Sequence, residues 1–145
     1  MEIDLSKYHS ICIDSCILIY FIQGDKKFSK IINNIFTEIS KNDGCINTSF
    51  LSLIEILVKP IENNDVDMIK KCKEYMLNSK ILHLIPLDEK IAEKSAYIRA
   101  KNGIKTPDAI EIATAVITGS DVFITNDKRL QKIKELPVII LDDIL

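Results

Sequence analysis

The sequence contains few of the residues that build linkers, phosphate-binding loops or membrane spans. Of its 145 residues only four are glycine and four are proline, which leaves no material for a flexible linker or a glycine-rich phosphate loop. No apolar run approaches the roughly 18 residues that a membrane-spanning helix needs. Residues 1–4 are acidic and lack the basic and apolar pattern of a signal peptide. We therefore expect a soluble globular domain that does not associate with membranes.

Neither sign of charge dominates, and no zinc motif is present. The 19 basic and 21 acidic residues give a formal net charge of −2, so a polyanion would have to bind a local basic patch. The four cysteines form no C-x-x-C pair, and neither His9 nor His83 has ligand spacing to a cysteine. Cys12 and Cys45 lie in apolar runs that are typical of buried, reduced thiols. These features predict a reduced cytoplasmic protein.

Short β-branched runs alternate with helical patterns along the whole chain. The runs are almost continuously apolar, as expected of strands that are buried on both faces of a sheet. They cover residues 10–13, 45–48, 81–85, 122–125 and 138–141. Apolar residues at helical spacing predict helices over about 26–41, 62–79 and 88–101. Three glycines follow helical stretches, where a residue with positive φ commonly ends a helix: Gly44, Gly103 and Gly119.

Alternating strands and helices predict an α/β fold. Crossovers of this kind are right-handed and place helices on both sides of a parallel sheet. We expect one three-layer α/β/α domain over residues 1–145, with a central, mostly parallel five-stranded sheet. In open sheets of this type, ligands bind beyond the carboxyl ends of the strands, near the point where the strand order reverses.

Two aspartates leave predicted strands at their carboxyl ends. Asp14 follows residues 10–13, and Asp127 comes shortly after residues 122–125. If these strands are neighbours, both carboxylates emerge at the same edge of the sheet. Either aspartate alone is more simply interpreted as a helix N-cap. The two together favour a functional site.

Glu55 lies in an unusually apolar frame. Seven of the nine residues 50–58 are apolar, which predicts a largely buried helix. An ionised glutamate in such a helix costs several kcal/mol unless it is paired or bound to a metal. Lys59, four residues on, could form an ordinary helical ion pair with it. Because a surface pair does not need this apolar frame, we favour a functional role for Glu55.

Asp108 lies at the predicted start of a helix rich in alanine. Thr106 is expected to be the N-cap and Pro107 the first helical residue. Asp108 then falls in the first turn, where the helix dipole favours a negative charge. The alanines that follow allow close packing on the sheet, which would keep Asp108 near its edge. Glu111, one turn on, is either an auxiliary acid or a solvated charge.

A cluster of these carboxylates would repel itself unless a cation offset its charge. Mg²⁺ and Mn²⁺ prefer oxygen ligands and suit a site built from carboxylates alone. A metal-bound water has a lowered pKa and can attack a phosphodiester. The chain has no phosphate-loop motif and no Ser-His-Asp set, and neither histidine lies near these motifs. The sequence therefore predicts hydrolysis that is assisted by a metal and acidic residues.

Four blocks of the sequence, in order, resemble the PIN-domain ribonucleases, in particular the VapC-type toxins of toxin–antitoxin pairs. The blocks are residues 13–20, 49–57, 106–115 and 123–127, and the resemblance covers nearly the whole chain. It implies a PIN-like fold in which an acidic quartet binds Mg²⁺ or Mn²⁺: Asp14, Glu55, Asp108 and Asp127. Asp14 and Asp108 match the positions most directly involved in metal ligation. The polar residues beside the ligands would be Ser15, Thr125 and Asn126.

The same resemblance implies endonucleolytic hydrolysis of RNA by a homodimer that a small cognate antitoxin holds inactive. RNA capture would use cations near the motifs: Lys26, Lys27, Lys30, Lys59, Lys101, Lys105, Lys128 and Arg129. Two alternatives stay open. The chain could be a PIN-type nuclease of RNA processing or decay without an antitoxin, or a PIN-fold module that binds RNA or a partner without cleaving. A phosphatase of the haloacid dehalogenase type would need D-x-D where this chain has Asp14-Ser15-Cys16.

Overall fold

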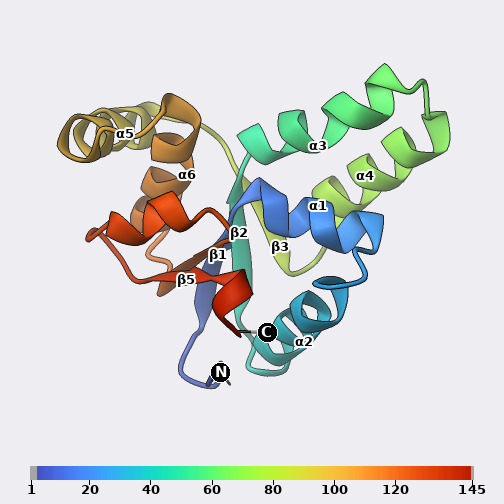
Figure 1. The fold of residues 1–145 in the computed structure, drawn as a ribbon, viewed down its shortest axis with the longest axis horizontal. Helices are drawn as coiled ribbons and strands as arrows, with labels where there is room; N and C mark the ends of the chain where they lie inside the picture. The colour runs from blue at the N-terminus through green and yellow to red at the C-terminus, as the bar shows by residue number, and fades with distance from the viewer. Residues whose placement is uncertain (1–2, 145) are drawn as a thin grey trace.

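The computed structural model describes residues 3–144 of the chain (Figure 1). Within these residues the strands form one parallel five-stranded sheet in the order β3-β2-β1-β4-β5. The strands are β1 (Ser10–Ile13), β2 (Cys45–Ser49), β3 (Leu82–Ile85), β4 (Val122–Thr125) and β5 (Val138–Ile140). All five predicted strands form to within one residue at each end, and the predicted three-layer α/β fold is confirmed.

Helices cover both faces of the sheet (Figure 1). They are α1 (Ser15–Gln23), α2 (Ser29–Lys41), α3 (Leu51–Glu62), α4 (Val66–Asn78), α5 (Glu89–Asn102) and α6 (Thr106–Ile117), with short 3₁₀ turns η1 (Lys128–Lys132) and η2 (Leu141–Ile144). Helices α1 to α4 lie on one face, and α5 and α6 lie on the other. No helix within residues 3–144 has the length and apolar character needed to cross a membrane.

The central strand β1 is buried from both sides, which explains its continuous apolar sequence. Ile11 and Ile13 point into the core that α1 to α4 cover, whereas Cys12 points into the core under α5 and α6. All three side chains are fully buried. Alternating side chains on one strand therefore supply two separate cores, as expected of a sheet that is covered on both faces.

The strand order reverses at β1. The chain builds β1, β2 and β3 outward in one direction, and then crosses back through α5 and α6 to add β4 on the free side of β1. Ile13 pairs with Ile124, and the amide of Asp14 donates to the carbonyl of Ile124 at 3.0 Å. The carboxyl ends of β1 and β4 therefore adjoin at the reversal point, where ligands bind in open parallel sheets.

Two predicted helices begin later than their apolar patterns suggested. The pattern over 26–41 becomes a helix only at Ser29, because the Asp25 side chain accepts from the amides of Lys27 and Phe28 and holds a turn. The pattern over 62–79 becomes a helix at Val66, where Asp65 caps by accepting from the amide of Met68 at 3.1 Å. Aspartate side chains therefore fix both starts, at α2 by holding the turn before the helix and at α4 by capping it.

Helix α6 begins one residue earlier than expected, so the predicted N-cap was wrong. Lys105 is the N-cap residue, and Thr106 already has helical geometry. The Thr106 hydroxyl accepts a hydrogen bond from Arg99 Nη1 at 2.7 Å instead of capping the helix. Asp108 nevertheless stays in the first turn, as the sequence predicted.

Two of the three glycines expected at helix ends adopt positive φ, and Gly44 does not. Gly103 and Gly119 have φ of 65° and 71°, which confirms the prediction for them. After helix α2 the left-handed residue is instead Asp43, with φ of 54°. Gly44 is constrained by space, because a Cβ there would lie 2.7 Å from the carbonyl oxygen of His9.

We expect Gly44→Ala to lower the free energy of unfolding by about 1–3 kcal/mol, the usual cost of overpacking. The new methyl group would meet the His9 carbonyl at 2.7 Å and the Ile39 carbonyl at 3.0 Å, and both are backbone atoms. Gly119→Ala is the matched control, since nothing lies within 4 Å of its Cβ position. It should cost only the left-handed strain, about 1 kcal/mol. Urea denaturation measures both, and equal losses would contradict the steric explanation.

Candidate active site

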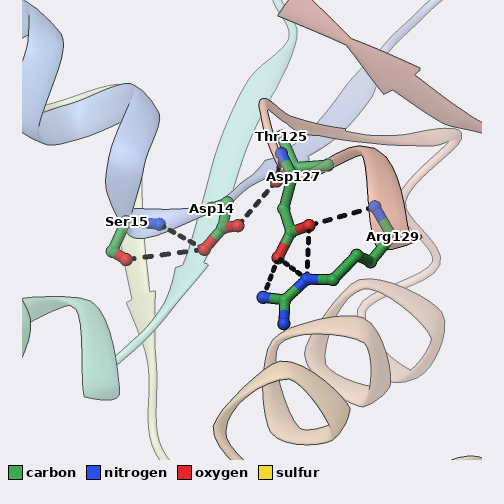
Figure 2. A network of polar contacts seen from close by, with 5 residues as sticks. All are labelled: Asp14, Ser15, Thr125, Asp127 and Arg129. Atoms are coloured by element: carbon green, nitrogen blue, oxygen red, sulfur yellow. Dashed lines mark hydrogen bonds and ion pairs between the residues drawn. The ribbon is translucent and has the colours of Figure 1, made fainter. Parts of the chain in front are cut away.

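Asp14 is the centre of a polar network at the carboxyl edge of the sheet (Figure 2). It follows β1 and serves as the N-cap of α1, with Oδ1 accepting from the amide of Ser15 at 2.8 Å. Its other oxygen, Oδ2, accepts from the hydroxyl of Thr125, at the end of β4, at 2.7 Å. Asp14 therefore caps a helix, as the simpler interpretation predicted, and its second oxygen also binds the end of the neighbouring strand.

Ser15 connects Asp14 with Glu55. Its Oγ donates to Glu55 Oε2 at 2.7 Å and lies 3.4 Å from Asp14 Oδ1. Ser15 itself is buried, so this hydroxyl has a fixed position between the two carboxylates. Residues 40 positions apart along the chain thus meet because α1 and α3 leave neighbouring strands at the same edge.

The predicted burial of the Glu55 helix was wrong. Helix α3 buries only one face, and Ile54 and Val58 are 61% and 47% exposed. The reason is that α3 and α4 run side by side and extend beyond the sheet, so that only one side of α3 has a partner (Figure 1). The alternative ion pair of Glu55 with Lys59, which the sequence did not favour, does not form. Lys59 lies 3.9 Å from Glu62 instead, and Glu55 turns toward Ser15.

Asp127 is paired with Arg129 (Figure 2). Arg129 donates from Nη2 to Asp127 Oδ2 at 2.6 Å and from Nε to Oδ1 at 3.0 Å. These hydrogen bonds hold the pKa of Asp127 below its ordinary value. The amide of Asp127 donates to the Thr125 hydroxyl at 3.1 Å, so Thr125 joins Asp127 to Asp14.

Asp108 is half-buried and lies in the first turn of α6. Burial raises its pKa above the ordinary value, and the negative charges of Asp127 and Glu55 add to the rise. The positive charges of Arg129 and Lys105 act in the opposite direction. Asp108 therefore shares one electrostatic environment with two of the other acids, although they come from separate elements of the fold.

The pKa of Asp14 is also raised. Burial is the main cause, and the charges of Asp108 and Glu55 contribute. The hydrogen bonds from Thr125 and Ser15 favour the ionised form and oppose this rise. Both pKa values therefore stay raised despite the groups that oppose the rise, and a divalent cation beside these acids would oppose it further.

The donor set fits Mg²⁺ or Mn²⁺ in its chemistry, because every candidate ligand is a carboxylate oxygen. Within residues 3–144, no three histidine, cysteine, aspartate or glutamate side chains come close enough together to hold one metal ion. In this arrangement the Asp127 carboxylate is bound by Arg129 and Asp14 accepts from Ser15 and Thr125. The acids share one edge of the sheet without forming a closed ligand cage.

Asn126 faces away from the acids. Its Oδ1 accepts from the amide of Asp142 at 2.9 Å, and its Nδ2 donates to the hydroxyl of Tyr20 at 3.3 Å. The side chain therefore ties the end of β4 to α1 and η2, whereas its neighbour Thr125 contacts Asp14 directly.

Glu111 is the acid whose environment the sequence left open. It is 2% exposed, so the interpretation as a solvated charge was wrong. Its Oε1 lies 3.1 Å from Ser52 Oγ, and Oε2 has no hydrogen-bond partner within the described part of the chain. Burial raises its pKa well above the ordinary value, and the charges of Asp14 and Glu55 add to this. The small, polar Ser52 inside an apolar run was the available signal for a buried polar partner.

Comparisons with known proteins agree with the observed fold. The family model described as "PIN domain" matches residues 11–136. A VapBC2 complex of Rickettsia felis bound to a promoter DNA fragment contains a similar chain, with a TM-score of 0.74 and 17% identity over 90% of this chain and 97% of that one. A chain of a toxin–antitoxin complex from Klebsiella pneumoniae has a TM-score of 0.66 and 22% identity, over 90% of this chain and 97% of that one. A chain of DNA-bound VapBC from Salmonella typhimurium has a TM-score of 0.64 and 18% identity, over 91% of this chain and 98% of that one. Curated protein sequences gave no significant match.

We expect Asp14→Asn to leave the free energy of unfolding of the metal-free protein unchanged or raised at neutral pH. The folded-state pKa of Asp14 lies above the ordinary value of 3.8. Between those two pKa values the folded state binds more protons than the unfolded chain, so stability falls as the pH rises through this window. An asparagine cannot ionise, so the free energy of unfolding of the variant should decrease less over this pH window than that of the unaltered chain. Denaturation in the presence of a chelator, from about pH 4 to pH 8, measures it.

Asp127→Asn is the matched control, because its shift has the opposite sign. The pKa of Asp127 is lowered by Arg129, so its contribution is present above the ordinary value of 3.8 and is lost as the pH falls. The same substitution should therefore lower stability at neutral pH, by up to about 1 kcal/mol for a partly exposed ion pair. A larger loss in Asp14→Asn than in Asp127→Asn would contradict the repulsion we assign to Asp14.

Proposed function

Because the chain belongs to the PIN domain family, we propose that residues 1–145 form a single nuclease domain, a metal-dependent endoribonuclease that is the toxin of a toxin–antitoxin pair. The observation that carries this proposal is that Asp14 is joined to Glu55 through Ser15 and to Asp127 through Thr125. The similar solved chains come from toxin–antitoxin complexes, which supports the proposed biological role. The free thiols of Cys12, Cys16, Cys45 and Cys72 fit a reducing cytoplasm.

In this proposal Asp14, Glu55, Asp108 and Asp127 hold Mg²⁺ or Mn²⁺. Such an ion lowers the pKa of a bound water and offsets the charge that develops on the phosphate during hydrolysis. The Ser15 amide and the Thr125 hydroxyl hold Asp14 in place by hydrogen bonds at both of its oxygens. Asp14 and Asp108, with their raised pKa values, gain most from a nearby cation.

In this proposal, positively charged side chains at the rim of the site bind the RNA. The Arg129 side chain is 71% exposed although it pairs with Asp127, so its guanidinium can also meet a phosphate. Lys105 is exposed at the start of α6, where its charge reaches Asp108 and Asp127. Lys27, Lys59 and Lys101 instead pair with acids outside the site. A small local basic rim therefore offsets the acidic net charge of the chain.

An exposed apolar stripe on α3 supports a protein partner. Phe50, Ile54, Val58 and Ile61 recur at helical spacing and are 39% to 61% exposed. Side chains of this kind on one helix face mark an interaction surface. We propose that a small cognate antitoxin and a second copy of this chain are the partners, as the resemblance to toxin–antitoxin pairs implies.

Asp14→Asn and Asp108→Asn should each reduce RNA cleavage by at least about a hundredfold, because loss even of a group that only supports a metal ligand costs up to about that much. The assay incubates purified protein with total RNA in Mn²⁺ or in EDTA and maps the cut sites by sequencing. Asp67→Asn, at an exposed position on α4, is the matched control and should cleave like the unaltered chain. Full activity in either site variant, or in EDTA, would reject the assigned roles.

Expression of the active chain in a bacterial host should arrest growth, and expression of Asp14→Asn should not. Co-expression of the product of a short reading frame adjacent to this gene should restore growth if the chain is a toxin. Cleavage without growth arrest, with no such reading frame, would instead assign the chain to RNA processing or decay. Binding of RNA without any cleavage would identify a non-cleaving module.

A further inference from the structure

A buried chain of polar contacts runs beneath the acidic edge of the sheet. Thr48 Oγ1 lies 2.9 Å from the carbonyl oxygen of Ile13 and 2.7 Å from Ser52 Oγ. Ser52 Oγ in turn lies 3.1 Å from Glu111 Oε1. Thr48 and Ser52 are completely buried, and Glu111 is 2% exposed. All three contacts are therefore shielded from bulk solvent.

Three residues of this buried network lie close in sequence to residues of the acidic quartet. Ile13 immediately precedes Asp14, and Ser52 lies one helical turn before Glu55. Glu111 lies one turn after Asp108 on α6. Thr48 belongs to β2, which carries no acid and joins the other segments. The contacts thus tie together β1, α3 and α6, which between them present three of the four carboxylates.

The number of hydrogens available defines the state of Glu111. The three contacts need three hydrogens, and the hydroxyls of Thr48 and Ser52 carry only one each. If Glu111 were ionised, one contact would bring two oxygens together with no hydrogen between them. A neutral Glu111 supplies the missing hydrogen, so that Glu111 donates to Ser52, Ser52 donates to Thr48, and Thr48 donates to the Ile13 carbonyl.

The surroundings of Glu111 favour this neutral form independently. Oε2 has no hydrogen-bond partner within the described residues, and an ionised carboxylate left so poorly satisfied in the interior is costly. Burial raises the pKa of Glu111 and the charges of Asp14 and Glu55 add to the rise, which exceeds the opposing effect of hydrogen bonding from Ser52 and the Ser49 backbone.

We propose that Glu111 is a neutral positioning residue whose hydrogen bond to Ser52 holds α3 against α6 and thereby sets the separation of Glu55 and Asp108. The part of this inference that concerns the metal rests on the proposed function. The protonation of Glu111 rests on the three contacts and on the unpartnered Oε2, and does not depend on the proposed function. Glu111 itself is not a ligand in this assignment.

Infrared spectroscopy of the metal-free protein at neutral pH tests the protonation. The unaltered chain should show the carbonyl stretching band of a protonated carboxylic acid, and this band should be missing in Glu111→Gln. The spectrum of Asp14→Asn separates any contribution from Asp14, whose pKa is also raised. A spectrum in which Glu111→Gln removes no such band would overturn the inference.

Mn²⁺ binding, measured by calorimetry, tests the positioning role. Glu111→Gln keeps the shape and a hydrogen-bond donor for Ser52, so its affinity should stay within about twofold of that of the unaltered chain. Glu111→Met has a similar volume and no such donor, and should bind about tenfold more weakly, as is typical for loss of a group that supports a ligand. Ser52→Ala removes the bridging hydroxyl and should weaken binding similarly, which keeps the test valid if Glu111→Met does not fold.

The outcomes separate the possible roles. Loss of Mn²⁺ binding in Glu111→Gln to the level of Asp14→Asn would make Glu111 a ligand and overturn the positioning role. Unchanged binding in both Glu111→Met and Ser52→Ala would overturn it as well. If the unaltered chain binds no Mn²⁺, the proposed metal-dependent function and the positioning role both fail, while the infrared band still decides the protonation of Glu111.

Discussion

The pairing of β1 with β4 is the constraint on which the site depends. It joins the two parts of the sheet at the point where the strand order reverses. It also places Asp14 beside Thr125, although 111 positions separate them. The amide of Asp14 completes the ladder by donating to Ile124, so the backbone of this aspartate is fixed by the sheet itself. Ser15 connects Glu55 to this aspartate and Thr125 connects Asp127 to it, while the charge of Asp108 contributes to its raised pKa.

The fold offsets the repulsion among its acids in a different way at each position. Asp127 is neutralised by Arg129, which lies two residues away. Asp14 accepts hydrogen bonds on both oxygens, which partly offset the effects of burial and of its acidic neighbours. Asp108 has no comparable compensation beyond the more distant charges of Arg129 and Lys105. A divalent cation at this edge would therefore relieve Asp14 and Asp108 most, and these are the positions to which the family resemblance assigns metal ligation.

Much of the fold could be predicted from the sequence, because buried parallel strands leave a continuous apolar signal in each run. The positions of Asp14 and Asp127 followed from the same signal, since a residue that ends a strand lies at the edge of the sheet. The exposure of Ile54 and Val58 could not be predicted, because it depends on how α3 packs against α4 rather than on its composition. The contact of Glu111 with Ser52 joins residues 59 positions apart, and although Ser52 interrupts an apolar run, the sequence does not identify Glu111 as its partner.

The central claim is that acids from separate elements converge on one divalent cation. A crystal structure of the protein grown with Mn²⁺, with the ion located by its anomalous scattering, tests it most directly. The account predicts a manganese peak at the carboxyl edge of the sheet, bonded to oxygens of both Asp14 and Asp108 at about 2.1 Å, the range of a hard divalent ion. A fully loaded crystal in which manganese binds elsewhere, or contacts neither of these two carboxylates, would contradict it.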